Sequence, residues 1–551
     1  MSDMSDMSDL SDGLSPVRRI KSLGSSRQEP TFGRLKKLPM RCILLRLQNF
    51  NLNKVQNMRF TSTRSSRDIE SAQAIAQGLA EDGGLFVPQE FPKLDSDMID
   101  KLIGMNYKER ACAVLSCYLT DFTADEIRNC VDGAYTGTFD NEDPAPVKEV
   151  APGMNLLELW HGPTCAFKDM ALQLLPYLMT VSARKVNPDR TIVILVATSG
   201  DTGKAALDGF ADVPGTRIIV FYPHNGVSAM QKLQMTTQEG SNVAVCSIEG
   251  NFDDAQTGVK NIFADPEMKA YLAERNMEFS SANSINFGRL VPQIIYYVSA
   301  YCDLIKAGRI KKGESFNVTV PTGNFGNILA AVYAKQMGIP IGKFICASNK
   351  NNVLTDFINT GCYDRNRPFH TTNSPSMDIL ISSNLERMLY LLYGNDDAAV
   401  ADLMKQLKEQ GRYEVSKEVL SKLQDQFFGG YCDDEATRNT IAELFKENNY
   451  LCDTHTAVAV NVYKQYVKAT GDKTPTVIAS TASPYKFASA VLPAVCDEAL
   501  PEDEFGMVEK LSAVTGTAIP VPLATLKDRK VLHTSKVDKN SMSGFIKNFL
   551  G

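Results

Sequence analysis

The 551-residue sequence has little tryptophan, little histidine and no long apolar segment. No run of about 18 uncharged apolar residues occurs, so the sequence predicts no membrane-spanning helix. It contains one Trp, five His and twelve Cys without a C-x-x-C pair, which argues against a zinc site and against a disulfide scaffold in so long a chain. We therefore expect free, buried thiols and no metal. The formal net charge of −6 offers no electrostatic reason to expect nucleic-acid binding.

Residues 1–57 differ in composition from the rest. They begin with the repeat MSDMSDMSDLSD, and residues 13–57 contain one acidic residue against ten Lys and Arg. Such a segment has little periodic apolar surface to bury, so we expect a disordered extension. Its basic stretch from Met40 is similar to a transit peptide for a plastid or a mitochondrion, but it follows an acidic repeat. A start at Met58 is an equal alternative to a targeting role, and a cytoplasmic location is the interpretation we favour.

From about residue 146 the sequence predicts an α/β protein. Short β-branched runs alternate with helical segments, which is typical of parallel strands covered on both faces. The runs are 191–197, 217–222, 243–247, 316–320, 343–348 and 475–480. Between about 380 and 450 the strand signal disappears, and the leucine spacing that begins at Leu385 indicates helix.

The expected organisation has five parts, of which the core is divided into two segments. They are a disordered extension (1–57), a mostly helical N-terminal domain (58–145), an α/β core (146–378 and 451–530), a helical insert within it (379–450) and a C-terminal tail (531–551).

Lys168 lies at the start of an expected helix within ELWHGPTCAFKDMALQLLPYL. The apolar residues that follow at helical spacing are Ala171, Leu174, Leu175 and Leu178. A lysine in a partly apolar pocket has a lowered pKa, because burial disfavours the ammonium, and its neutral amine can form a Schiff base with a carbonyl. Taken alone, the pattern also fits a solvated surface lysine.

Two further segments lead from a strand into a helix through glycines. ATSGDTGKAAL (197–207) lacks the first Gly of a nucleotide P-loop and has Ala205 where a magnesium-binding Ser or Thr would stand, so it is not a P-loop. VPTGNFGNILAAVYAKQMG (320–338) spaces Gly323 and Gly326 three apart, which suits a single phosphate on backbone N–H groups. Each segment also fits a tight turn without a ligand.

A fourth segment, IASTASPYKFASAV (478–491), places small polar residues between a strand and a helix. Ser480 or Thr481 can hydrogen-bond a ring nitrogen, and capping of the helix is the alternative. Loops at the carboxyl edge of a parallel sheet bind ligands, and a lysine-bearing segment joins them here. A cofactor with an aldehyde, a phosphate and a ring nitrogen would use all four segments, and pyridoxal phosphate is such a cofactor.

The chain resembles the threonine synthase family, which are pyridoxal-phosphate enzymes of the tryptophan-synthase-β-like fold. The similarity runs from about Phe60 to Phe487 and rests on motifs in the family's order. The motifs are HGPTCAFKDMALQ, SGDTG, SANSIN, GNFGN, NKNNVL and STASPYKF. The resemblance implies two parallel-sheet, three-layer domains, a mostly helical N-terminal domain and a helical insert.

The resemblance also implies site residues. Lys168 matches the lysine that binds the cofactor as a Schiff base and then carries protons, and Thr481 matches the hydroxyl residue that faces the pyridine nitrogen. Asp201 stands where many relatives of this fold carry Asn, which contacts the ring's phenolic oxygen, so a shared proton would be required there. The residues matching the phosphate-binding loop are Gly323, Asn324, Phe325, Gly326 and Asn327.

Two segments supply candidates for substrate binding. Ser199, Thr202 and Lys204 flank Asp201. Asn283, Asn286 and Arg289, in SANSINFGR, are candidates for binding the substrate's phosphate or carboxylate. An arginine fork suits either anion.

The implied reaction converts O-phospho-L-homoserine and water to L-threonine and phosphate, in a monomer or homodimer. A second interpretation is a threonine-synthase-like phospho-lyase that eliminates phosphate without forming threonine. Such relatives have small residues at the positions of Asn324 and Phe325, so the intact GNFGN favours the synthase. A non-catalytic relative that serves as a binding protein is a third.

Overall fold

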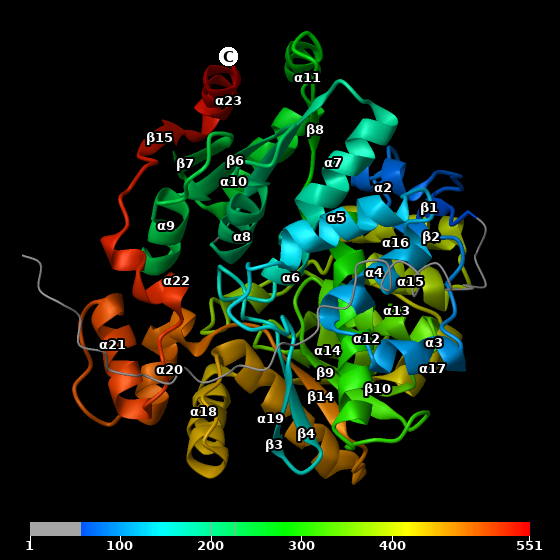
Figure 1. Ribbon diagram of the computed structural model, residues 1–551, viewed down its shortest axis with the longest axis vertical. Helices are drawn as coiled ribbons and strands as arrows, with labels where there is room; N and C mark the ends of the chain where they lie inside the picture. The colour runs from blue at the N-terminus through cyan, green and yellow to red at the C-terminus, as the bar shows by residue number, and fades with distance from the viewer. Residues whose placement is uncertain (1–56, 199, 226) are drawn as a thin grey trace, which may run out of the picture. The chain divides into compact units, whose positions relative to one another are not determined.

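The computed structural model describes residues 57–551 except 199 and 226. The expectations for the extension, including its disorder and any targeting role, therefore fall almost entirely outside the described residues. The described part contains two larger sheets, one of six strands and one of five, and two two-stranded sheets. Figure 1 shows the five-stranded sheet above and the six-stranded sheet below.

The six-stranded sheet has the order β13-β10-β9-β14-β4-β3, and only β3 runs antiparallel to its neighbour. Its strands are β3 (Val147–Ala151), β4 (Met154–Glu158), β9 (Phe316–Pro321), β10 (Ile341–Ser348), β13 (Phe427–Tyr431) and β14 (Thr476–Ser480). In β10, Ile345 and Ala347 pack in one apolar cluster with the long helix α19 (Thr454–Thr470), and the alternating Phe344 and Cys346 are equally buried. Because successive strand residues point to opposite faces, both faces of this sheet are covered.

The five-stranded sheet is entirely parallel, in the order β15-β7-β6-β5-β8. Its strands are β5 (Thr191–Ala197), β6 (Thr216–Pro223), β7 (Val243–Glu249), β8 (Met277–Ser280) and β15 (Ser535–Asp538). The helices between them are α8 (Asp201–Phe210), α9 (Ala229–Thr236), α10 (Phe252–Ala264) and α11 (Pro266–Ala273). The six strands predicted from the β-branched runs are confirmed as β5, β6, β7, β9, β10 and β14.

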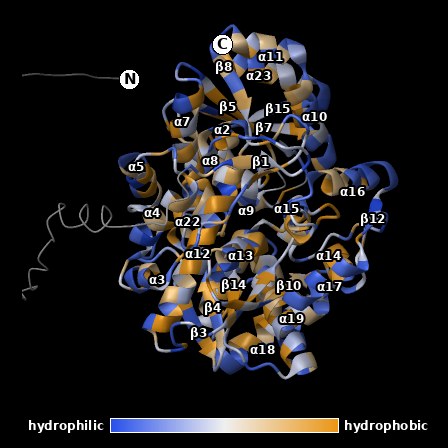
Figure 2. Ribbon diagram, turned by 90° about the vertical axis from the view of Figure 1, so that its right-hand side faces the viewer, coloured by the Kyte–Doolittle hydropathy of each residue, from blue (hydrophilic) through white to orange (hydrophobic). Residues whose placement is uncertain are grey.

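Helices dominate the segment before the first large sheet, and further helices pack against the sheets and against one another. The early segment contains β1 (Phe60–Ser62), β2 (Phe86–Pro88), α2 (Ser71–Gln77), α3 (Ser96–Ile103), α4 (Tyr107–Tyr118) and α5 (Ala124–Tyr135). Capping boxes at Asn106 and Thr123 fix where α4 and α5 begin. The helices that follow are α6 (Asp169–Leu172), α7 (Leu175–Val186), α12 (Phe287–Lys306), α13 (Gly326–Gln336) and α14 (Val353–Thr360). In Figure 2, hydrophobic residues concentrate along α12 and on β4 and β14, the buried part of this arrangement.

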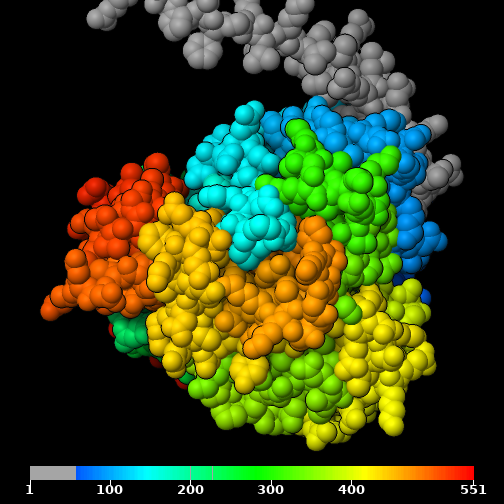
Figure 3. Space-filling model, turned by 90° about the horizontal axis from the view of Figure 1, so that it is seen from below, coloured from blue at the N-terminus to red at the C-terminus, as the bar shows by residue number. Residues whose placement is uncertain are grey.

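The insert is mostly helical, as expected, but it also contains two strands where no strand signal was found in the sequence. Its helices are α15 (Leu385–Leu392), α16 (Asp397–Gln410), α17 (Lys417–Gln426) and α18 (Asp434–Asn448). However, β12 (Arg412–Glu414) pairs with β11 (Cys362–Asp364), and β13 forms an edge of the six-stranded sheet. The sequence of β13, FFGGY, has neither alternation nor β-branched residues, so only its pairing with β10 makes it a strand. Figure 3 shows α18 and α19 beside the β3–β4 hairpin on the underside.

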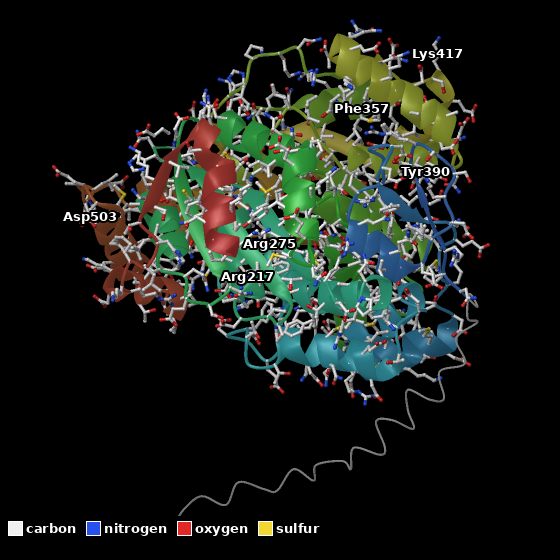
Figure 4. The ribbon with its side chains drawn as sticks, turned by 90° about the horizontal axis from the view of Figure 1, so that it is seen from above. Arg217, Arg275, Phe357, Tyr390, Lys417 and Asp503 are labelled. Atoms are coloured by element: carbon white, nitrogen blue, oxygen red, sulfur yellow. The ribbon has the colours of Figure 1, made fainter. Side chains whose placement is uncertain are left out.

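The C-terminal part contains more structure than the expected tail. After α20 (Ala488–Val495), α21 (Glu504–Thr515) and α22 (Val521–Ala524), β15 extends the five-stranded sheet and α23 (Met542–Leu550) packs its residue Ile546 into that sheet's core. Arg217 and Arg275 lie beside this helix (Figure 4). Arg275 donates to the Gly551 carbonyl (2.7 Å) and Arg217 lies over the Phe549 ring. Residues 535–551 are therefore part of a folded layer.

Candidate active site

Lys168 precedes α6, and its side chain points into the protein. The Nζ atom donates to the Ser376 hydroxyl (3.2 Å) and lies 3.6 Å from a carboxylate oxygen of Asp201. The side chain is 10% exposed. Burial lowers the pKa of Lys168, while the Asp201 carboxylate opposes that shift. The site therefore favours loss of a proton from this amine more than bulk water does.

The loop that carries Lys168 is tied to the end of β14. Phe167 N–H donates to the Thr481 carbonyl (2.8 Å), Ser483 N–H donates to the Cys165 carbonyl (3.0 Å), and Ala166 forms a bridge with Ala482. Two segments that are more than 300 residues apart in sequence are thus joined by an isolated antiparallel bridge. This pairing places Lys168 and Thr481 beside each other at the carboxyl edge of the six-stranded sheet.

Asp169 holds the same loop from inside. Its carboxylate accepts hydrogen bonds from the Thr164 N–H (2.8 Å) and the Thr164 hydroxyl (2.7 Å). A Cβ on Gly162 would lie 2.5 Å from Asp169 atoms, so only glycine fits there. Burial raises the pKa of Asp169 to about 7, against these hydrogen bonds. The residue supports the loop and does not face Lys168 in any recorded contact.

The expected helix after Lys168 is broken into two. All four residues of the predicted apolar stripe are buried, but α6 ends at Leu172 and α7 begins at Leu175, with Pro176 in its first turn. Proline is favourable at the start of a helix and unfavourable inside one, so the break falls before it.

The 323–327 turn connects β9 to α13 and has its carbonyls occupied. The Ser382 hydroxyl donates to the Gly323 carbonyl (2.7 Å) and the Asn384 N–H donates to the Asn324 carbonyl (3.1 Å). Phe325 is buried at φ +61°, a left-handed conformation that turns the chain into α13. The first N–H groups of α13 have no acceptor within the helix, so this turn offers donors to an anion.

Asn327 adds a donor at the same place. Its Oδ1 accepts hydrogen bonds from the Tyr296 and Tyr297 hydroxyls, which fixes the orientation of the amide. Its Nδ2 is buried without a hydrogen-bond partner among the described residues. A buried unpaired N–H₂ costs free energy unless a ligand or water accepts from it.

The 323–327 turn and Lys168 both lie close to Ser376. A Cβ on Gly323 would lie 3.0 Å from the Ser376 carbonyl oxygen, and the Ser376 hydroxyl contacts Lys168. Ser376 was not among the residues expected from the sequence. Its N–H donates to His455 Nε2 (3.1 Å), and since Nε2 accepts, His455 Nδ1 donates to Asp453 (2.7 Å).

Asp201 begins α8, and its carboxylate faces several donors. Lys486 Nζ lies 3.0 Å from Oδ1, where Gln231 also donates (3.1 Å). Burial alone would raise the pKa of Asp201, but the charges of Lys486 and Lys168 outweigh burial and hold this pKa well below its usual range. Lys486 was also missed, because a single lysine in SPYKF carries no signal by itself.

Ser480 and Thr481, the two candidates at the end of β14 for contacting a ring nitrogen, differ in their hydrogen-bond partners. The Ser480 hydroxyl accepts hydrogen bonds from Trp160 Nε1 and from the Thr456 hydroxyl, each at 3.2 Å. The Thr481 hydroxyl has no hydrogen bond recorded in the described part of the chain, and the residue is 5% exposed. Thr481 is therefore the one whose hydroxyl is available to a ligand.

Arg289 is a buried guanidinium, 6% exposed, in the first turn of α12. It donates to the Ala282 carbonyl (2.8 Å), and no carboxylate of the described residues lies within ion-pair distance. Burial lowers its pKa to about 10. An unpaired buried arginine favours the binding of an anion.

The other substrate-binding candidates are arranged differently. Asn286 caps α12 and donates to the Ile75 and Ser281 carbonyls, so its amide is fully used, and Lys204 pairs with Asp208 (2.9 Å). Thr202 is half-buried in α8 and Asn283 is exposed. Ser199 lies outside the described residues.

The sequence predicted free thiols and neither a membrane-spanning helix nor a metal site. No helix of the described residues is long and apolar enough to cross a membrane. No group of three or more potential metal ligands occurs in that part of the chain. Its eleven cysteines are free thiols, most of them buried, as the sequence predicted.

Three family models match the chain. "Threonine synthase N terminus" matches residues 59–135, "Pyridoxal-phosphate dependent enzyme" matches 156–481, and "Threonine synthase, C-terminal" matches 456–527. The second of these covers more than half of the sequence.

The chain is also similar to individual proteins over most of its length. Threonine synthase-like 1 of Homo sapiens is 44% identical over 435 residues, which are 77% of this chain and 58% of that protein, so the chain spans less than two thirds of this relative. Threonine synthase of Pseudomonas aeruginosa is 36% identical over 476 residues, 86% of this chain and 94% of that protein. The crystal structure of PLP bound threonine synthase from Brucella melitensis has a TM-score of 0.80 at 36% identity, covering 89% of this chain and 99% of that chain.

Proposed function

Because the chain belongs to the threonine synthase family of pyridoxal-phosphate dependent enzymes, we propose that it converts O-phospho-L-homoserine and water to L-threonine and phosphate. Family membership confirms the resemblance and the fold class inferred from the motifs. The observation that carries the proposal is the buried Lys168 amine, which lies between Asp201 of the five-stranded layer and Ser376 beside the 323–327 turn.

The residues around Lys168 fit pyridoxal phosphate. Lys168 would hold the cofactor through its amine, and the 323–327 turn would hold the phosphate on its N–H groups. The unpaired Asn327 Nδ2 supports this assignment, since an anion there would supply its missing acceptor. Thr481 would face the ring nitrogen with its available hydroxyl, and Asp201 would lie near the ring. When bound, pyridoxal phosphate supplies an electron sink that stabilises negative charge on the substrate.

Lys168 would also carry protons during the reaction. Burial favours its neutral form, and the Ser376 hydroxyl and the Asp201 carboxylate hold the amine in one orientation. A base whose pKa lies closer to the working pH exchanges protons with less cost. His455 keeps Ser376 in place through the backbone N–H, so Asp453 and His455 act on Lys168 only through position.

Arg289 would bind an anionic group of the substrate. The proposal rests on its burial and on its lack of a carboxylate partner in the described residues. Thr202, Asn283 and Ser199 remain candidates for further polar contacts. Asn286 and Lys204 have the partners described above, so any role for them in substrate binding would require those contacts to change.

The rival activity is phosphate elimination without threonine formation. The 44% identity with threonine synthase-like 1 favours it, while the intact GNFGN sequence at 323–327 favours the synthase. The two activities share Lys168 and differ only in whether water adds before product release.

One assay separates these possibilities. Phosphate, threonine and 2-oxobutyrate are measured together from O-phospho-L-homoserine for the wild type, for Lys168→Ala and for Lys510→Ala, a control in an exposed ion pair. We expect equal phosphate and threonine from the wild type and the control, and neither product from Lys168→Ala. If the wild type releases phosphate and 2-oxobutyrate but no threonine, the protein is a phospho-lyase and the synthase proposal is refuted. Full activity of Lys168→Ala would refute both.

Cytoplasmic location and a monomeric or homodimeric state remain part of the proposal. Fractionation of cells that express the full chain and the mass of the purified protein in solution test them.

A further inference from the structure

Two lysines contact one buried carboxylate at this site. Asp201 contacts both Lys168, which is 10% exposed, and the buried Lys486, and the buried Arg289 also acts on Lys168. Lys486 is the nearer of the two, at 3.0 Å from Oδ1 against 3.6 Å between Lys168 and Oδ2. The two lysines therefore share one counter-charge, one on each oxygen.

Lys486 is held more tightly than an ordinary surface lysine. Its side chain is 1% exposed and lies in the short 3₁₀ helix η2 (Pro484–Phe487). Besides Asp201, its Nζ donates to the Thr164 carbonyl in the Lys168 loop (2.7 Å). A buried ammonium with two such partners has a fixed position, because moving it would leave a desolvated charge unpaired. Its position is thus a fixed feature of the site.

We propose that Lys486 is a positioning residue that occupies Asp201 and thereby prevents this carboxylate from holding Lys168 as a permanent ammonium. The proposal depends on the role of Lys168 given above, and it adds a residue to that role. Without Lys486, Asp201 would have Lys168 as its only contacting cation, and a carboxylate beside an amine favours the protonated amine. With Lys486 present, much of that negative charge is already compensated.

The charges that face Lys168 come from three elements. Asp201 on α8 raises the pKa of Lys168, whereas Lys486 on η2 and Arg289 on α12 lower it, in addition to burial. Ser376 adds a hydroxyl that does not titrate in this range. Lys486 and Asp201 therefore have opposite effects on the proton affinity of the Lys168 amine. The effects of removing both residues should largely cancel.

The test is a pH titration of the visible absorbance of bound pyridoxal phosphate in the full-length holoenzyme, where this absorbance would report protonation of the Lys168 nitrogen in its Schiff base. We expect Lys486→Met to raise the titration midpoint by at least ~1 unit and Asp201→Asn to lower it. The double variant should return to within about half a unit of the wild type. An unchanged or lowered midpoint in Lys486→Met overturns the proposal.

Two further variants keep the result interpretable. Lys486→Arg retains the charge and should titrate near the wild type, and Lys510→Met, in an exposed pair with Glu498, should leave the midpoint unchanged. If Lys486→Met fails to bind the cofactor, the double variant with Asp201→Asn must regain it, and failure of both overturns the proposal. Failure of the proposed function looks different, since Lys168→Ala would then keep the cofactor absorbance.

Discussion

The turn after β5 and the turn after β9 both lead from a buried parallel strand into a helix, yet their N–H groups have different partners. After β5, the Thr198 hydroxyl accepts hydrogen bonds from the N–H groups of Gly200 (3.0 Å) and Gly203 (2.9 Å). After β9, side chain and backbone donors of residues 382–384 bind the carbonyls of the 323–327 turn instead. The turn after β5 thus pairs two of its N–H groups with its own Thr198 hydroxyl. In the turn after β9, neighbouring residues pair with the carbonyls and not with the N–H groups.

The two turns also differ in whether an acidic residue begins the following helix. Asp201 stands in the first turn of α8, where the helix dipole already favours a negative group. No acidic residue stands in the first turn of α13. The helix after β5 thus carries its own anion, and the helix after β9 can accept one from outside. Two glycine-rich turns that are similar in sequence therefore differ in whether an acidic residue of the chain already occupies the start of the helix.

Thr198→Val should have the largest effect, and on stability. Valine keeps the shape but leaves the N–H groups of Gly200 and Gly203 buried and unpaired, at about 2–4 kcal/mol in the free energy of unfolding. Chemical denaturation measures it. Thr180→Val is the control, since that hydroxyl only donates to the Pro176 carbonyl. Equal losses in both variants would contradict the difference between the turns.

Asn327→Asp should act on cofactor affinity. The new carboxylate keeps the acceptor for the two tyrosines but replaces the unpaired Nδ2 with negative charge where a phosphate is proposed, and we expect about a 10²-fold higher Kd for pyridoxal phosphate. Fluorescence or absorbance titration of the cofactor measures it. Asn366→Asp, an exposed change of equal charge, should leave the Kd unchanged. An unchanged Kd in Asn327→Asp would remove the phosphate from this turn.

Asp201→Asn should change the acid dependence of stability. The folded-state pKa of Asp201 lies below its unfolded value, so its ionised form stabilises the fold above that unfolded value, near pH 4, and this stabilisation is lost as the pH falls further. As the pH falls below about 4, the variant should lose up to about 1.4 kcal/mol less per pH unit than the wild type. Denaturation at a series of pH values measures both slopes. Identical slopes would show that Asp201 does not titrate with folding.

Ser382→Ala should have the smallest effect. It removes one hydrogen bond to the Gly323 carbonyl and so loosens the 323–327 turn, which we expect to cost about 1 kcal/mol, or a roughly fivefold higher Kd for pyridoxal phosphate. Ser512→Ala, which removes a similar bond to the Thr517 carbonyl elsewhere, is the control. A loss of cofactor affinity in the control equal to that in Ser382→Ala would mean that the bond to Gly323 has no special role.

Several features of the site could be predicted from local sequence alone. Runs such as TIVILVA and FNVTV are apolar enough to be recognised as buried strands from the sequence. Small residues after a parallel strand indicate the sheet edge where ligands bind. The hydrophobic spacing after Lys168 correctly identified its buried face, although Pro176 broke the helix. Strand β13 gave no local signal, because its conformation depends on pairing with β10.

Residue type alone was a weaker guide to the partners of each side chain. Asn286 and Lys204 have the chemistry of ligands, but neighbouring residues satisfy them. Ser376 has no motif that singles it out, yet it contacts Lys168 from 208 positions away. Lys486 likewise meets Asp201 only after the two sheets are packed together.

The amino-acid sequence by itself determined the alternation of strands and helices, the four loops that meet at the sheet edges and the lysine among them, because hydrophobic period and turn residues act over short distances. The tertiary structure alone decided which N–H groups remain unpaired and how many charges surround that lysine. Hydrogen bonding and proton affinity depend on distances of a few ångströms between groups that lie far apart in the chain, and only packing sets those distances.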